Sequence, residues 1–109
     1  MLEHAAGLAY DAREGVLYIA ERDAHAIRRI RISIDPSSWM LEPWSGTGVA
    51  GHRDGPIESI QWNSPWGLAL DAERRILYVA DSGNHVVRAV SVESSPTTSR
   101  TVLGVPGRP

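Results

Sequence analysis

Two histidines occupy equivalent positions in the sequence, and a pair of histidines can bind a metal ion. His25 and His85 lie sixty residues apart, and each follows a short polar stretch that begins with an acidic residue, Glu21 or Asp81. A zinc site needs three or four converging ligands, whereas the chain offers four scattered histidines and no cysteine. We therefore interpret both histidines as turn residues that bond the carboxylate four residues before them, and we predict no metal site.

Two aspartates, Asp11 and Asp71, follow the first apolar run of each half of the chain and could serve as catalytic carboxylates. An aspartate in this place more commonly accepts hydrogen bonds from the backbone N–H groups of a turn. The sequence also lacks a Ser/His/Asp order, a glycine-rich phosphate loop and a metalloprotease helix. We predict no catalytic residue and no cofactor, which favours a protein that is not an enzyme without deciding the question.

Arginines and tryptophans form the second candidate set, because both can stack on nucleic-acid bases or on a peptide. Eleven basic and thirteen acidic residues give a net charge of -2, so no global field attracts nucleic acid. Arginines 28, 29 and 31 alternate with isoleucines that a core would bury, and the tryptophans could instead fill space between structural units. We expect a protein partner rather than RNA. The candidate binding residues are Arg22, His52, Arg53, Trp62 and Trp66.

The elements that must position these residues are short apolar runs separated by polar turns. Residues 67–70, 76–80 and 86–92 are each too short for a helix and have the length of a strand. The turn between the last two offers side-chain acceptors, a Gly83 that can take a positive φ and an Asn84 that tolerates it. The predicted structural turn residues are Asp81, Gly83, Asn84 and His85, with Glu21 and His25 at the matching places.

The same pattern occurs twice, which makes the chain an internal repeat. Residues 7–30 and 67–90 share ten identities in twenty-four positions aligned without gaps. The repeat predicts four strands in each unit. The fourth strand should lie on an outer edge, because Pro43 has no backbone N–H to donate to a neighbouring strand. In the first unit the expected strands are 6–10, 16–20, 26–34 and 39–45, and Ile30, Ile32 and Ile34 should lie on one face of the third. In the second unit they are 67–70, 76–80, 86–92 and 99–103, with a polar hairpin at 93–98 before the last.

A long loop joins the two units. Residues 46–56 contain four glycines and one proline, which is typical of an irregular connection. Residues 56–61 could form one helical turn with Asp54 as its cap. Four-stranded meanders that repeat at a fixed period are the sequence form of propeller blades, so we predict an all-β fold of two four-stranded antiparallel meanders.

The residues that carry this pattern resemble the NHL repeat. The segments Pro65–Asp71 and Leu77–His85 carry the resemblance, and the loop with Gly48, Gly51, Asp54-Gly55-Pro56 and Asn63-Ser64-Pro65 is similar to the linker between such repeats. The first unit departs from the pattern at residues 21–25 and at Ala5-Ala6. The resemblance implies a β-propeller of about six blades, with blade 1 at residues 1–46, an inter-blade crossing loop at 47–66, and blade 2 with the start of the next connector at 67–109.

Two blades cannot close such a ring, and stacked repeats need three or more units for stability. We expect the chain to be part of a longer propeller, or three copies of it to form a cyclic, head-to-tail homo-oligomer. The favoured function is a non-enzymatic interaction and scaffold module, whose loops present a rim to a protein partner. The alternatives are a propeller-type metal-dependent lyase or hydrolase, and an RNA-binding NHL domain.

Membrane insertion and export have no signal in the sequence. No apolar run approaches the ~20 residues of a membrane span, and residues 1–4 lack the basic start and apolar core of a signal peptide. We expect no membrane partner, and an intracellular location is compatible with the sequence.

Overall fold

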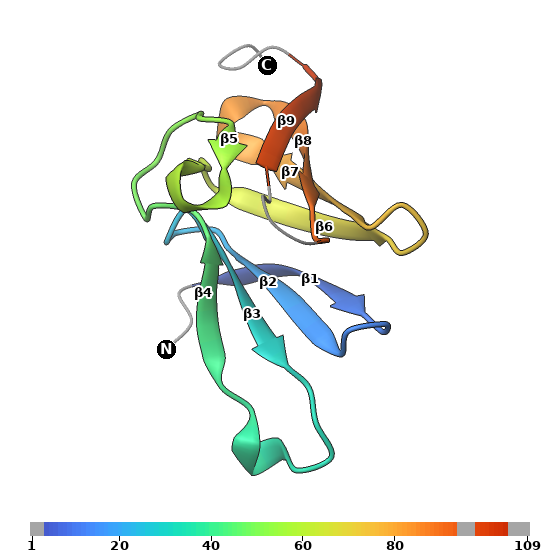
Figure 1. Ribbon diagram of the computed structural model, residues 1–109. Helices are drawn as coiled ribbons and strands as arrows, with labels where there is room; N and C mark the ends of the chain where they lie inside the picture. The colour runs from blue at the N-terminus through green and yellow to red at the C-terminus, as the bar shows by residue number, and fades with distance from the viewer. Residues whose placement is uncertain (1–3, 94–97, 105–109) are drawn as a thin grey trace.

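The computed structural model describes residues 4–93 and 98–104, which form two antiparallel sheets that lie face to face (Figure 1). The prediction of an all-β fold of blade-like meanders is confirmed, since the strands of each meander follow one another in chain order. Blade 1 consists of β1 (Ala5–Asp11), β2 (Val16–Glu21), β3 (Ala26–Arg31) and β4 (Leu41–Ser45). Blade 2 consists of β6 (Pro65–Asp71), β7 (Ile76–Asp81), β8 (Val86–Ser91) and β9 (Thr98–Leu103).

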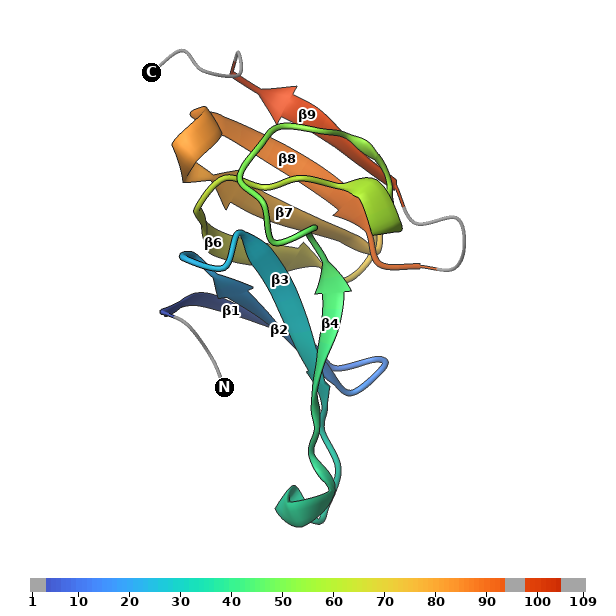
Figure 2. The same ribbon diagram turned by 90° about the vertical axis from the view of Figure 1, so that its left-hand side faces the viewer.

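The second sheet has a fifth strand that the sequence did not reveal. Strand β5 (Gly55–Pro56) comes from the crossing loop, which we now define as residues 46–64, and pairs antiparallel with the outer strand β9. The loop therefore extends blade 2 instead of merely joining the blades. In Figure 2 it runs from β4 across the outer part of the upper sheet before it enters β6.

Strand β3 is shorter than predicted because a protruding hairpin begins at Ile32 (Figure 2). Ile34, expected on the buried face, is fully exposed. The hairpin tip is a 3₁₀ turn, η1 (Pro36–Ser38), in which the Asp35 side chain accepts the Ser37 N–H at 3.0 Å. These local bonds remove the segment from the ladder, so β4 begins at Leu41 instead of residue 39. The corresponding hairpin of blade 2, at 93–98, lies mostly outside the described residues.

The helical turn predicted at 56–61 is a 3₁₀ turn, η2 (Ile57–Ser59), and it has no side-chain cap. Asp54, predicted as that cap, instead binds an arginine of blade 2, as described below. None of the helices in residues 4–93 and 98–104 is long and apolar enough to cross a membrane.

The turn between β7 and β8, which contains η3 (Ser82–Asn84), differs from its predicted geometry. The residue with positive φ is His85, at 59°, and His25 has the same conformation at 51°; Gly83 and Asn84 do not. Glycine is needed at position 83 for another reason. A Cβ there would lie 2.7 Å from the Asn63 carbonyl oxygen and would overlap the Asn63 amide group.

The main core lies between the blades. Blade 1 and blade 2 each contribute one face of β-branched, leucine and aromatic side chains, and the crossing loop fills the outer part of the gap. A fully buried apolar side chain of this kind contributes about 1.5–3 kcal/mol. The core residues are Val16, Tyr18 and Ile27 from blade 1, Leu77, Val79 and Val90 from blade 2, and Ile60 and Trp62 from the loop.

A buried ion pair also joins the blades. Asp11 at the end of β1 and Arg75 in the turn before β7 are 1% and 4% exposed, and Arg75 Nη1 donates to Asp11 Oδ1 at 2.9 Å while Nη2 donates to Oδ2. Asp11 also accepts the N–H of Glu14 at 3.4 Å, as expected of a turn aspartate. The Arg75 hydrogen bonds outweigh the opposing effect of burial and hold the pKa of Asp11 below its usual value.

Replacing Asp11 with asparagine should therefore lower the free energy of unfolding by about 3 kcal/mol at pH 7, because it leaves the Arg75 charge buried and unpaired. Urea denaturation measures the loss. The matched control is Asp71→Asn in the equivalent turn, where the partner Arg74 is exposed and the pair contributes at most about 1 kcal/mol. Equal losses in the two variants would contradict the inter-blade role of Asp11.

The same pair predicts a pH dependence. A carboxyl with a depressed folded pKa contributes full stability above its unfolded pKa of about 3.9 and loses it as the pH falls through the lower folded value. The wild-type protein should thus lose stability steeply below about pH 4. In Asp11→Asn this acid-side loss should be smaller, which denaturation at several pH values would measure.

Candidate functional site

Arg88 on β8 anchors the crossing loop to blade 2. Its side chain is completely buried, and its guanidinium lies 4.2 Å from the centre of the Trp62 ring. Nη1 donates to the Gln61 carbonyl oxygen at 2.5 Å, and Nη2 donates to the Arg53 carbonyl oxygen at 2.7 Å. One cation thus satisfies two backbone acceptors and stacks on an aromatic ring of the same loop.

Asp54 supplies the loop's carboxylate to this cation. Arg88 Nη2 and Nε donate to Asp54 Oδ1 at 2.8 and 3.1 Å. Two hydroxyls of β9 complete the shell, since Ser99 Oγ donates to Oδ1 at 2.8 Å and Thr101 Oγ1 to Oδ2 at 3.2 Å. Burial opposes ionisation of Asp54, but the hydrogen bonds from Arg88 and Ser99 prevail, and its pKa is lowered.

Asp81 closes the network from the hairpin turn. It is completely buried, and its Oδ2 accepts Arg88 Nη1 at 3.0 Å and Asn84 Nδ2 at 2.7 Å. Its Oδ1 accepts the Asn63 N–H at 2.7 Å, and Asn84 Nδ2 also donates to the Gly51 carbonyl oxygen at 2.9 Å. The turn that precedes β8 therefore binds the crossing loop at two points, Gly51 and Asn63 near its end, a role beyond the structural turn expected from the sequence.

His25 has a partner that the sequence did not predict. Its Nδ1 accepts the N–H of Ser64 at 3.0 Å, which joins the histidine to the end of the crossing loop. Glu21 forms an ion pair with Arg28, whose Nε lies 2.5 Å from Oε1. His85, the counterpart of His25, is exposed.

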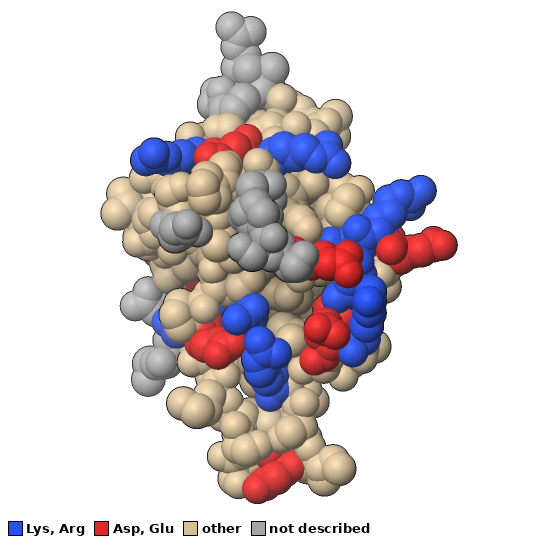
Figure 3. Space-filling view, viewed as in Figure 1, with Lys and Arg blue, Asp and Glu red and all other residues tan. Residues whose placement is uncertain are grey.

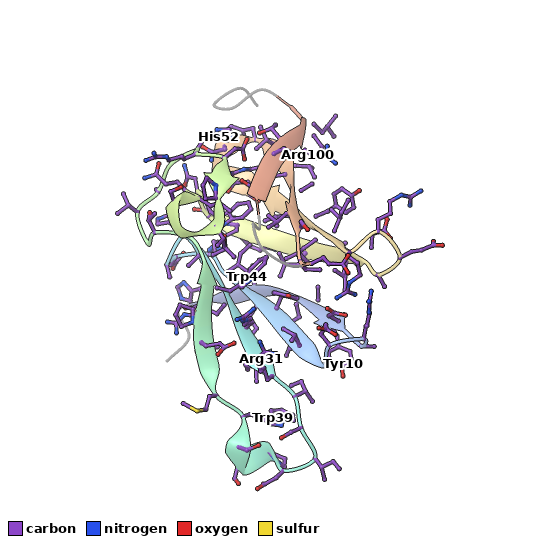
Figure 4. The ribbon with its side chains drawn as sticks, in the orientation of Figure 1. Tyr10, Arg31, Trp39, Trp44, His52 and Arg100 are labelled. Carbon is purple, nitrogen blue, oxygen red and sulfur yellow. The ribbon has the colours of Figure 1, made fainter. Side chains whose placement is uncertain are left out.

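The five candidate binding residues do not converge on one site. Arg22 lies 4.9 Å above the ring of Trp66, which is 49% exposed. His52 and Arg53 lie on the crossing loop, where His52 Nε2 is 2.9 Å from Thr101 Oγ1 and Arg53 is exposed (Figure 4). Trp62 is completely buried and donates to Ser45 Oγ at 3.0 Å, so it packs the core and is closed to a partner.

The face shown in Figure 3 carries no concentration of charge of one sign. On the face shown in Figure 3, arginines lie beside aspartates and glutamates. Among the described residues, no three histidine, aspartate or glutamate side chains gather in a way that could hold a metal ion.

Each blade has one free apolar face, as expected of two blades that cannot close a ring. Tyr10 on β1 is 52% exposed, on the side of blade 1 that faces away from blade 2 (Figure 4). Leu8, two residues earlier on the same strand and so on the same face, is 60% exposed. The opposite end of the molecule carries a shallow apolar hollow, lined by Gly67, Leu68, Ala69, Tyr78, Ala80 and Val87. Both faces belong to strands whose sequences are apolar on both sides, which is the pattern of sheets packed on each face.

Arg88→Lys should lower the free energy of unfolding by about 3 kcal/mol, because a lysine cannot reproduce the fork of donors and leaves buried acceptors unpaired. Urea denaturation at neutral pH gives the value. Arg28→Lys is the matched control at the equivalent position of blade 1, where the side chain is 29% exposed and one ion pair is recorded; it should cost about 1 kcal/mol. A larger loss in the control would refute the anchoring role of Arg88.

Comparisons with known proteins agree with this geometry. Residues 63–89 match the family model of the NHL repeat, a segment that runs from the end of the crossing loop into β8. NHL repeat-containing protein 2 of Bos taurus is 30% identical over 94 residues, which cover 85% of this chain and 12% of that protein. Its counterpart in Gallus gallus gives the same values.

Protein SUPPRESSOR OF QUENCHING 1, chloroplastic, of Arabidopsis thaliana is 29% identical over 107 residues, which cover 98% of this chain and 10% of that protein. The chain thus spans about one tenth of the length of the curated relatives it matches. The repeat, the two blade-like sheets and the loop between them point the same way: this chain belongs to the NHL-repeat family of β-propeller proteins.

Proposed function

We propose that this chain is a non-enzymatic scaffold module whose two blades join further blades head to tail, from other copies or from a longer chain. One observation carries the proposal. Each free face corresponds, position for position in the repeat, to a face that is already packed between blade 1 and blade 2. The interface inside the chain is therefore the template for the contacts at both of its ends.

The free face of blade 2 corresponds to the packed face of blade 1. Tyr18 is 3% exposed and packs against the ring of Trp44, with centroids 4.7 Å apart, beneath blade 2. Its counterpart Tyr78 lines the apolar hollow and is only partly buried. Ile27 is likewise fully buried, whereas its counterpart Val87 is partly buried. The difference is what a missing neighbour blade would produce.

The free face of blade 1 corresponds to the packed face of blade 2. Leu77 is fully buried between the blades, and its counterpart Leu17 is partly buried. Leu8, at 60% exposure, is the counterpart of Leu68, which packs against the core. Exposed apolar surface of this kind favours association, because its removal from water is favourable by roughly 25 cal/mol per Å².

Because the two faces differ, the contact is heterologous, and such contacts close into rings when the rotation allows it. Three copies would supply six blades. In such a ring the crossing loop and the turn at 81–84, which are bonded to each other, share one rim. Trp66, the partly exposed Arg22 that lies over its ring, and Arg53 are the described side chains we propose for contact with a protein partner.

Light scattering coupled to size exclusion tests the proposal. The wild-type chain should show a mass that rises with concentration towards three chains. Tyr78→Asp and Tyr10→Asp should each abolish this rise, since each places a charge in one of the two free faces. Val49→Asp, on an exposed apolar residue of the crossing loop away from both faces, should leave it unchanged.

A stable monomer at all concentrations, with cooperative unfolding, would show that the free faces need no neighbour. Association that survives both tyrosine variants would place the contact elsewhere. Either result overturns head-to-tail joining.

A further inference from the structure

We propose that Arg28 and the outer edge of β4 form a binding site for an acidic, extended peptide segment of another polypeptide. The site is the blade 1 counterpart of the place where the crossing loop binds blade 2. The inference deepens the proposed function, because a neighbouring blade would bring such a segment, yet the site can be tested without a ring.

The side chain of Arg28 is partly exposed, unlike that of its counterpart Arg88. Arg28 on β3 and Arg88 on β8 hold the same position in the repeat, and each pairs with the acidic residue at the end of the preceding strand, Glu21 or Asp81. Arg88 is fully buried under the crossing loop, whereas the Arg28 side chain is 29% exposed. Among residues 4–93 and 98–104, the recorded ion pair of Arg28 is with Glu21. The arginine that the crossing loop buries in blade 2 is therefore partly open to solvent in blade 1.

The edge of blade 1 is open in the same way. In blade 2, Gly55 pairs with Ser99 on the outer strand β9. Ser99 pairs with Val90, and its counterpart Leu41 pairs with Ile30, so Leu41 marks the equivalent place on β4. Strand β4 is the outer strand of its sheet as described. Its free backbone groups can therefore accept an added strand, as in β-augmentation.

The chemistry of the occupant follows from the occupied site. Arg88 receives the carboxylate of Asp54, and the two following residues, Gly55-Pro56, form the added strand. In blade 1, Leu41 and Pro43 stand where Ser99 and Thr101 donate hydroxyls to that carboxylate. Arg28 is thus the main charged group available to recognise the segment, and an acidic residue followed by a short extended stretch is the ligand that fits.

A synthetic, fluorescently labelled peptide with the sequence of residues 46–63 is the probe, and its anisotropy is measured against the wild-type chain. Binding should be saturable and should weaken as the salt concentration rises. The same peptide with Asp54→Asn should bind about tenfold more weakly or worse, since a hydrogen bond to a charged group is lost. This comparison needs no change in the protein.

Protein variants locate the site. Arg28→Gln should reduce affinity by a similar factor, and its fold is checked by circular dichroism. Arg29→Gln is the matched control, because Arg29 is 28% exposed on the same strand but pairs with Glu42 at 2.6 Å; it should bind the peptide as the wild type does.

Absence of saturable binding, equal affinity for the aspartate and asparagine peptides, or undiminished binding by a folded Arg28→Gln variant would each overturn the inference. Light scattering of the same samples without peptide separates this result from the proposed function. Association without peptide binding refutes the site alone, and peptide binding by a monomer supports the site where head-to-tail joining has failed.

Discussion

A long, glycine-rich loop loses much conformational entropy when it is laid against a sheet, and its few apolar side chains recover only part of that cost. In this protein the buried Arg88 guanidinium provides the compensation. From β8 it donates hydrogen bonds to two carbonyl groups of the loop and to the Asp54 carboxylate, and it stacks on the Trp62 ring. The loop can then carry Ile60 and Trp62 into the gap between the blades. The order of the outer core thus depends on one cation.

The two blades differ in what covers them, although their sequences are closely related. In blade 2 the crossing loop covers Arg88, which is fully buried, whereas in blade 1 the side chain of Arg28, which pairs with Glu21, is 29% exposed. Exposed Leu8 and Tyr10 belong to the same asymmetry. A repeat protein stabilised by contacts between neighbouring units is expected to show such incomplete ends wherever a unit lacks its neighbour.

The sequence predicted what depends on local pattern. The strands, their order and the outer position of Pro43 followed from apolar runs, turn residues and the sixty-residue repeat. It did not predict contacts between segments far apart in the chain. The identity of Arg28 and Arg88 was visible, but nothing local indicated that Arg88 would reach Asp54, thirty-four residues earlier. Gly83 was assigned to a turn conformation, whereas its true constraint is the approach of Asn63.

The most direct test of the account is a double-mutant cycle between Arg88 and Asp54. The free energies of unfolding of the wild type, Arg88→Gln, Asp54→Asn and the double variant are measured by urea denaturation. If this pair anchors the loop, the two losses should be coupled by about 1–3 kcal/mol, because the second substitution removes a contact that the first has already broken. Additive losses, within about 0.5 kcal/mol, would mean that the loop is held by other contacts and would contradict the account.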